Sequence, residues 1–181
     1  METVVADTCA LVSLAIPKAD ATYDTTANPD PLQYFLTGCT VFVPTQVRAE
    51  LQGMDGYDDI HAAAATNVLA ASAHYTVEDP LARSETPDSL PDHGLDDGEM
   101  AGILLANARD TDAFLTDEFT NIARVHALLE RATLVPTPRL LRDYARQGHM
   151  TSVQARTLVE TIAPHRSWDS NSYVQAILDT L

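Results

Sequence analysis

The sequence predicts one α/β domain, a three-layer sandwich in which helices cover both faces of a mostly parallel central sheet, with extra helices at its carboxyl end. Short apolar and β-branched runs alternate with helical patterns between residues 3 and 137, and this alternation is typical of parallel sheets. The connections between the elements are short, as they are in such folds. At 181 residues and 45% hydrophobic content, the chain is long enough for one domain with a substantial core.

The first half of the chain predicts two strands that each lead directly into a helix. Residues 3–7 form a β-branched run, and Thr8 is the expected cap of the helix that follows. Pro44 closes the second run, and Thr45 is the expected cap of the next helix. In order, the expected elements are a strand at 3–7, a helix from 8 through 15, a loop at 17–31, a short helical piece at 32–35, a strand at 40–43, a helix from 45 that is interrupted at 53–56, and an alanine-rich helix at 58–73.

The second half predicts three more strands and then only helices. A proline-rich and acidic segment at 79–95 predicts a loop, and the helix after it has one apolar side. The expected elements are a strand near 75–77, a helix at 97–109, a strand at 113–116, a helix at 122–128, a strand at 132–135, and helical pieces near 138–147, 151–163 and 170–179, with Gly148 and Pro164 as breaks. We therefore expect a sheet domain at residues 1–137 and a helical extension at 138–181 that packs on the same domain or mediates association.

Charge is the strongest signal in the composition. The chain carries 26 acidic and 11 basic residues, a net charge of −15, and Lys18 is its only lysine. An acidic surface that is poor in lysine is similar to that of proteins from salt-loading halophiles, in which a Debye length of about 3 Å near 1 M salt screens the self-repulsion. We therefore expect a cytoplasm of high salt concentration.

The basic residues are concentrated near the carboxyl end. Residues 1–118 have 21 acids and 4 bases, whereas residues 119–181 have 5 acids and 7 arginines. An anion-binding surface is therefore expected in the second segment. The candidate contacts to RNA phosphates are Arg124, Arg139 and Arg142, with Arg131 and Arg146 as further candidates, and the competing explanation is that these residues keep helix surfaces soluble.

Several classes of protein are excluded. No stretch approaches the roughly 20 apolar residues that span a bilayer, and the N-terminus lacks the order of a secretory signal. Cys9 and Cys39 are too few for a disulfide framework and lie in apolar runs, so we expect them to be reduced core residues. The six histidines lack metal-ligand spacing, and no glycine-rich turn for a dinucleotide follows the first strand. We expect a soluble cytoplasmic protein.

Four carboxylates are expected to meet at one edge of the sheet. Asp7 ends the first strand and Asp117 directly follows another, so both lie where ligands collect in open parallel sheets. Glu50 and Glu99 lie on helices near that edge, among residues that pack inward. Such carboxylates repel each other by about 4 kcal/mol per pair at ~4 Å and an effective dielectric near ~20. A hard cation such as Mg²⁺ or Mn²⁺ would hold them together and activate a water for phosphodiester cleavage.

Taken in order, these pieces resemble the signature of the PIN-domain nucleases. The matching segments are Val4-Val5-Ala6-Asp7-Thr8, Val43-Pro44 with Val47 and Glu50-Leu51, Leu95 with Gly98-Glu99, and Phe114-Leu115-Thr116-Asp117-Glu118. The resemblance covers about residues 3–136 and implies a metal-dependent ribonuclease that leaves a 5′-phosphate and a 3′-hydroxyl. The acidic quartet that it implies is Asp7, Glu50, Glu99 and Asp117, with Asp7, Glu99 and Asp117 as ligands of Mg²⁺ or Mn²⁺. The helical tail resembles that of PIN variants with a C-terminal helical extension.

Some positions of this quartet have alternatives. These are Asp96 and Asp97 for the third acid, Glu118 for the fourth, and Thr8 and Thr116 as residues that orient a water, although helix capping explains the threonines as well. Each acid also has a structural explanation: Asp117 as a helix cap, Glu99 as a charge that complements the helix dipole, and Glu50 as a partner of Arg48.

Other functions compete with this hypothesis. Haloacid-dehalogenase-type phosphatases need a second acid where this chain has Cys9, and receiver domains need a lysine that the second half lacks. The main alternative is a non-catalytic module of the same fold that acts through a protein or RNA partner, because an acidic surface binds RNA poorly at low salt. Within the nuclease hypothesis, a VapC-type toxin with an antitoxin-like partner, an RNA-processing enzyme and a homodimer all stay open.

Overall fold

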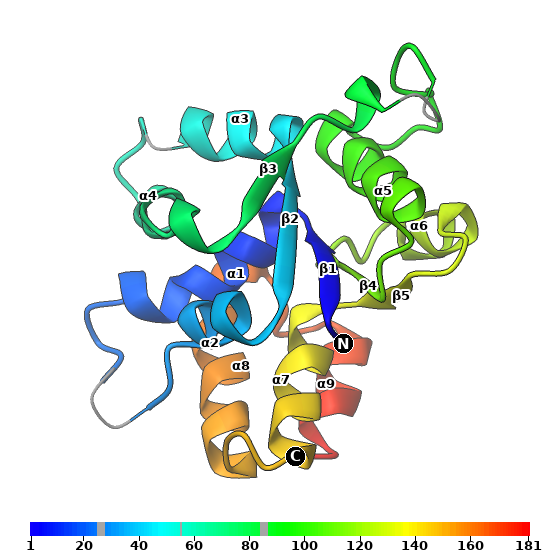
Figure 1. The fold of residues 1–181 in the computed structure, drawn as a ribbon. Helices are drawn as coiled ribbons and strands as arrows, with labels where there is room; N and C mark the ends of the chain where they lie inside the picture. The colour runs from blue at the N-terminus through cyan, green and yellow to red at the C-terminus, as the bar shows by residue number, and fades with distance from the viewer. Residues whose placement is uncertain (25–27, 55, 84–86) are drawn as a thin grey trace.

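The computed structural model describes residues 1–24, 28–54, 56–83 and 87–181. Parts of the predicted loops at 17–31 and 79–95, and of the interruption at 53–56, lie outside the described residues. Within the described part, parallel strands form one sheet in the order β3-β2-β1-β4-β5. The strands are β1 (Thr3–Ala6), β2 (Thr40–Pro44), β3 (Thr76–Glu78), β4 (Ala113–Leu115) and β5 (Thr133–Val135). The predicted fold class, a three-layer α/β/α sandwich with extra C-terminal helices, is confirmed (Figure 1).

Helices follow the strands and form the two outer layers of the molecule (Figure 1). They are α1 (Thr8–Ala19), α2 (Pro31–Gly38), α3 (Thr45–Met54), α4 (Ile60–Ala70), α5 (Asp97–Arg109), α6 (Ile122–Leu128), α7 (Thr137–Arg146), α8 (Ser152–Arg166) and α9 (Ser172–Leu178), with the short 3₁₀ helices η1 (Ser72–His74) and η2 (Pro80–Ala82). In the described ranges, no helix has the length and apolar character needed to cross a membrane.

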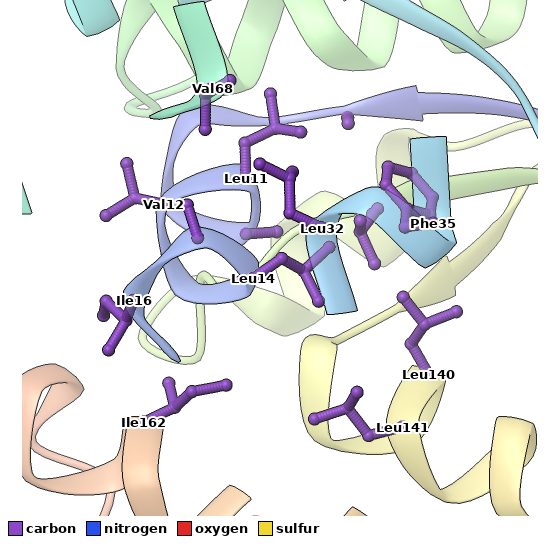
Figure 2. Packing of buried hydrophobic residues seen from close by; sticks show 14 of the residues in the cluster. Leu11, Val12, Leu14, Ile16, Leu32, Phe35, Val68, Leu140, Leu141 and Ile162 are labelled. Atoms are coloured by element: carbon purple, nitrogen blue, oxygen red, sulfur yellow. The ribbon is translucent and has the colours of Figure 1, made fainter. Parts of the chain in front are cut away.

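Alternating side chains of the sheet build a core on each face. Val4 and Ala6 of β1 belong to a large apolar cluster, whereas Val5 between them belongs to a smaller one with residues of α5 and α6. Figure 2 shows part of the large cluster, which contains Leu11, Val12, Leu14 and Ile16 of α1, Leu32 and Phe35 of α2, Val68 of α4, Leu140 and Leu141 of α7, and Ile162 of α8. The C-terminal helices thus share their core with the first helix, while the predicted boundary at residue 137 stays a prediction.

Four predicted helix ends are wrong. Thr45, which was expected to cap the helix after β2, is the first residue of α3. Asp7, not Thr8, is the N-cap of α1, because β1 ends one residue earlier than expected and the Asp7 side chain accepts the Thr8 N–H. Pro17 lies inside α1 and Pro164 lies inside α8, although both were expected to end their helices. Each proline falls in the last helical turn, where it removes a single backbone donor. Burial of the preceding residue in each case, Ile16 or Ala163, keeps that turn packed.

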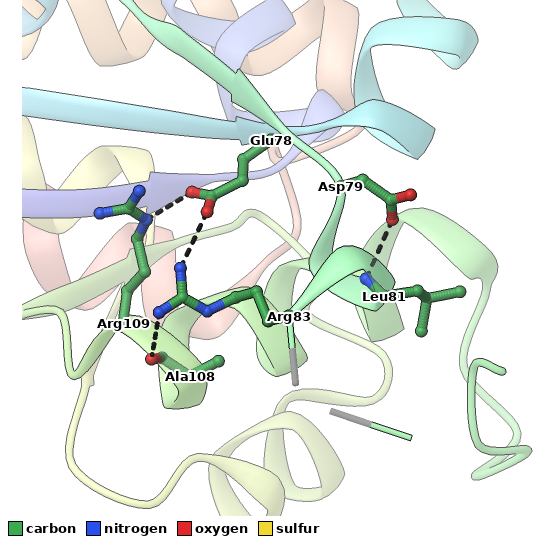
Figure 3. A network of polar contacts seen from close by, with 6 residues as sticks. All are labelled: Glu78, Asp79, Leu81, Arg83, Ala108 and Arg109. Atoms are coloured by element: carbon green, nitrogen blue, oxygen red, sulfur yellow. Dashed lines mark hydrogen bonds and ion pairs between the residues drawn. The ribbon is translucent and has the colours of Figure 1, made fainter. Parts of the chain in front are cut away.

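Polar contacts tie the outer strand β3 to α5 (Figure 3). Glu78 at the end of β3 accepts a bond from Arg83 at 2.9 Å and forms a second ion pair with Arg109. Arg83 also donates to the Ala108 carbonyl at 3.3 Å, and the Arg109 guanidinium lies 3.9 Å from the centre of the Phe42 ring. Two of the four basic residues in the segment 1–118 therefore serve the structure at this outer strand.

Candidate functional site

The adjacent ends of β1 and β4 place Asp7 at the carboxyl edge of the sheet. The Asp7 N–H donates to the Leu115 carbonyl at 3.0 Å, which continues the pairing of the two strands by one residue. Asp7 is only 4% exposed. Its carboxylate accepts bonds from the Thr8 N–H at 2.7 Å and from the Thr116 hydroxyl at 3.0 Å. Asp7 is therefore held rigidly at the edge where sequence reasoning expects ligands.

A pocket of about 230 Å³ opens beside Asp7. Three acids of the predicted quartet line it, namely Asp7, Glu50 and Glu99, and they come from the end of β1, from α3 and from α5. Its full lining is Asp7, Thr8, Cys9, Val12, Glu50, Met54, Asp96, Glu99, Glu118 and Arg166. The fold thus brings together acids that lie far apart in the sequence.

Glu50 lies against the first turn of α5. The Thr8 hydroxyl donates to its Oε2 atom, and a Cβ atom on Gly98 would lie 2.5 Å from its Oε1 atom. Glycine at position 98 therefore permits the close approach of this carboxylate to the positive end of the helix. Burial raises the pKa of Glu50, and the charges of Asp96 and Asp97 raise it further, against the opposing effect of the Thr8 bond.

Glu99 and Asp96 form a capping box at the start of α5. Asp96 Oδ1 accepts the Glu99 N–H at 2.7 Å, and Glu99 Oε2 accepts the Asp96 N–H at 3.1 Å. Both acids thus stabilise the helix end in addition to lining the pocket. Burial and the neighbouring Asp96 charge raise the pKa of Glu99 to about 7. Burial likewise raises the pKa of Asp7 to about 6. This is the response expected of buried carboxylates that lie close to one another.

Asp117, the fourth predicted acid, is not part of the pocket lining. It is 6% exposed, and its carboxylate accepts the Thr137 N–H at 2.7 Å and the Thr137 hydroxyl at 2.8 Å. Asp117 thereby fixes the start of α7, a structural role different from the cap of α6 that sequence reasoning considered. The next residue, Glu118, does line the pocket, and its Oε1 atom accepts the Asn121 N–H at 2.6 Å.

The secondary candidates occupy three different settings. Thr8 lines the pocket and bonds Glu50, whereas Thr116 reaches Asp7 from the side of β4. Asp97 is exposed at the first residue of α5 and is not part of the lining. Of the alternatives that the sequence left open, Asp96, Glu118 and Thr8 therefore line the pocket, whereas Asp97 and Thr116 do not.

Cys9 is a site residue that sequence reasoning missed. Its thiol donates to Asp7 Oδ2 at 2.9 Å and accepts the Asp117 N–H at 3.1 Å, so it links the two aspartates. Burial and the two negative charges raise the pKa of the thiol well above its ordinary value. Its position two residues after Asp7, in the first turn of α1, could have indicated a place beside the carboxylate. Its apolar neighbours in the sequence instead favoured the prediction of a core residue.

The arginines predicted to contact phosphates lie elsewhere. Arg124 donates to the Gly94 carbonyl at 3.0 Å. Arg139 and Arg142 pair with Asp143, at 3.6 and 2.9 Å. None of the three lines the carboxylate pocket, whereas Arg166 at the end of α8 does. Sequence reasoning did not select Arg166, because nothing local connects it with residues at the other end of the chain.

A larger pocket lies at the opposite edge of the sheet. Its volume is about 720 Å³, and its lining includes residues near the starts of the strands, such as Glu2, Cys39 and Asp112. Of the predicted site residues, it includes only Arg139. The carboxyl edge, not the size of a cavity, therefore identifies the candidate site.

Within the described ranges, no group of three or more His, Cys, Asp or Glu side chains is arranged as ligands of one metal ion. The chain matches no protein-family model, no curated protein and no solved structure.

Proposed function

We propose that this chain is a divalent-metal-dependent endoribonuclease that works at the carboxylate pocket. One observation carries the proposal: Asp7, Glu50 and Glu99, from three separate segments, line one small pocket, and burial raises the pKa of each. Crowding of this kind costs free energy when the acids are ionised, and a bound cation would offset that cost. The order of the motifs along the chain, which resembles that of PIN domains, supports RNA as the substrate.

The donor set suits a hard ion. The carboxylates offer oxygen ligands, and the raised pKa of the Cys9 thiol keeps it protonated near neutral pH, so it offers no thiolate for a softer metal. Asp7 and Glu99 would hold Mg²⁺ or Mn²⁺, and the remaining acid would be Glu118 or Asp117. When bound, the ion would activate a water and stabilise the charge that develops on the phosphate.

Glu50 is placed to handle a proton. The Thr8 hydroxyl and the first turn of α5 fix its carboxylate, and its raised pKa brings its proton affinity closer to neutral pH. A carboxylate of this kind accepts a proton from an attacking water more readily than an exposed one does. Glu50 would therefore act as the general base. A 5′-phosphate and a 3′-hydroxyl as products follow from the family resemblance.

A non-catalytic binding module of the same fold is the second candidate. It is favoured by Asp117, both of whose carboxylate oxygens are engaged by Thr137, and by the capping box that engages Asp96 and Glu99. In that case these acids would act only as structural residues. A protein partner such as an antitoxin, or an RNA held without cleavage, would then carry the function.

An RNA cleavage assay at high salt separates the two candidates. Structured and unstructured RNAs are incubated with Mg²⁺ or Mn²⁺ and with wild type, Asp7→Asn or the control Asp58→Asn, which removes the same charge from an exposed position. We expect cleavage by wild type and Asp58→Asn that requires metal, and a loss of at least about 100-fold in Asp7→Asn. Equal cleavage by Asp7→Asn would refute the assigned pocket, and no cleavage by wild type would favour the binding module.

One further variant tests Glu118 as the fourth acid, and a second tests the structural role of Asp117. Glu118→Gln keeps an acceptor for the Asn121 N–H and removes one charge from the pocket. If Glu118 is a ligand, this variant loses activity and Mn²⁺ affinity at an unchanged melting temperature. Asp117→Ala removes both bonds to Thr137 and should cost about 2–3 kcal/mol of stability in either case.

A further inference from the structure

We propose that Arg166, the last residue of α8, binds the RNA phosphate next to the carboxylates, so that the C-terminal extension completes the site. This inference rests on the proposed function and names the residue of the site that would hold the substrate. Arg166 is the single basic residue in the lining of the carboxylate pocket, among the residues that the structure describes. It is therefore the side chain in that lining with a charge opposite to that of a phosphate.

The guanidinium of Arg166 has an unused donor. Its Nε atom is buried and has no hydrogen-bond partner in the described part of the chain. Other arginines in the same half of the chain are paired: Arg139 and Arg142 contact Asp143, and Arg156 lies 3.6 Å from Glu160. None of the ion pairs found among the described residues includes Arg166, although its charge opposes the rise in the pKa of Asp117. A buried donor without a partner is unusual in a folded protein, and a phosphate bound by Arg166 would provide an acceptor for it.

Contacts on both sides of Arg166 hold it in place. The His165 carbonyl lies 2.9 Å from His61 Nε2, which anchors the end of α8 to α4. Trp168 is 3% exposed, and its ring meets the Phe119 ring edge to face at 5.9 Å between centroids. Phe119 directly follows Glu118, so the segment around Arg166 packs on the same loop that supplies an acid to the pocket. The position of Arg166 is thus defined by the fold.

The chemistry of the pocket calls for a cation of this kind. Asp7, Glu50, Asp96, Glu99 and Glu118 would together repel an approaching phosphate. A guanidinium presents several donors in one plane and matches two phosphate oxygens at once, which an ammonium group does not. Arg166 would therefore orient the phosphate and offset the negative charge of the pocket on the side of α8.

RNA binding without cleavage tests this role. In the Asp7→Asn background with Mn²⁺ present, the Kd for a single-stranded RNA is measured over a series of salt concentrations for added Arg166→Gln, Arg166→Lys or Arg156→Gln. Arg156→Gln is the matched control, because Arg156 lies on the same helix as Arg166 but is not part of the pocket lining and pairs with Glu160. Melting temperatures of all variants are measured alongside.

We expect Arg166→Gln to weaken RNA binding by about tenfold and to reduce the slope of log Kd against log salt by ~0.7, the value for one lost phosphate contact on a single strand. Arg166→Lys should keep the slope and bind with intermediate affinity, and Arg156→Gln should match the background. In the otherwise wild-type chain, Arg166→Gln should mainly raise KM. Should Arg166→Gln unfold, Arg166→Lys still tests the proposal, because equal affinity of Lys and Arg would contradict a two-oxygen contact.

Failure of this inference is distinguishable from failure of the proposed function. Cleavage by wild type together with unchanged binding and slope in Arg166→Gln overturns the role of Arg166 alone. Absence of cleavage by wild type, with RNA binding that depends on Arg166, overturns the nuclease and supports the phosphate contact. A wild-type chain that neither cleaves nor binds RNA overturns both.

Discussion

At the scale of single residues, burial of acids is the dominant feature of the site. Asp7 and Glu99 are almost inaccessible, and their pKa values rise to about 6 and about 7. Ordinary carboxyl groups in an unfolded chain titrate near ~4. The folded, metal-free protein therefore binds protons at these positions that the unfolded chain releases, and this difference couples its stability to pH.

The metal-free protein should lose stability as the pH rises from about 4 to about 7. Because the folded pKa of Asp7 is raised, its contribution is fully present below the unfolded pKa near 3.8 and is lost as the pH passes about 6; a shift of this size is worth on the order of 3 kcal/mol. Melting temperatures with a chelator present test this, and Mn²⁺ should restore stability near pH 8 but not near pH 4.5.

Asp7→Asn isolates the contribution of this one acid. Its melting temperature should vary less with pH than that of wild type or of Asp58→Asn, and Mn²⁺ should raise it less. A metal-free wild type whose melting temperature rises steadily across the same range would contradict the assignment of burial as the cause.

At the scale of elements, α5 positions two of the acids through close packing on the sheet. Gly102 lies over β4, and a Cβ atom there would come within 2.5 Å of the buried Phe114 ring. Gly53 of α3 has nothing within 4 Å of the same atom. Position 102 therefore requires glycine for the contact between α5 and β4, whereas position 53 has room for a side chain.

Gly102→Ala should destabilise the protein by about 1–3 kcal/mol, because the methyl group overpacks a rigid aromatic ring. Gly53→Ala should instead stabilise it by up to about 1 kcal/mol, since alanine is the better helix former and meets no obstacle. Denaturant unfolding of both variants gives the two values. Similar effects of the two substitutions would show that α5 can move away from β4 at little cost.

The sequence predicts the elements well where local chemistry decides them. The bounds of α5 are predicted because Asp96 and Asp97 are strong helix-start residues and the apolar side ends at Arg109. The positions of Asp7, Glu50 and Glu99 near one edge follow from strands that alternate with helices. The prolines at 17 and 164 mislead because burial of Ile16 and Ala163, which is a tertiary effect, extends each helix past its local signal.

The rest of the site depends on contacts that no local pattern contains. Asp117 is not part of the pocket lining, and Thr137, 20 residues later, supplies two donors to its carboxylate. Arg166 reaches the pocket because His61 and Phe119 fix the segment that carries it. Both effects require the docking of α7 and α8 on the sheet domain, which sequence reasoning places only as a general expectation.

At the scale of the whole molecule, the excess of negative charge lowers the stability of the folded state. The chain carries −15, and the segment 1–118 holds 21 of its 26 acids, so the folded state brings many like charges together. Salt screens such repulsion over distances longer than about 10 Å at 0.1 M and about 3 Å at 1 M. The high-salt cytoplasm expected from the composition stays a prediction. Screening by salt has a direct physical consequence, because it should raise the stability of the folded chain.

The melting temperature should rise with KCl concentration, by roughly 5 °C or more between about 0.1 M and 2 M near pH 8, because screening relieves repulsion in the compact state more than in the expanded one. Near pH 4.5, the pI given by the sequence, the net charge approaches zero and the same salt step should have a much smaller effect. Comparison of the two pH values separates screening of net charge from a general salting-out effect on apolar surface, which depends little on protein charge. Equal gains at both pH values would assign the effect to apolar burial and remove the physical basis for expecting a high-salt environment.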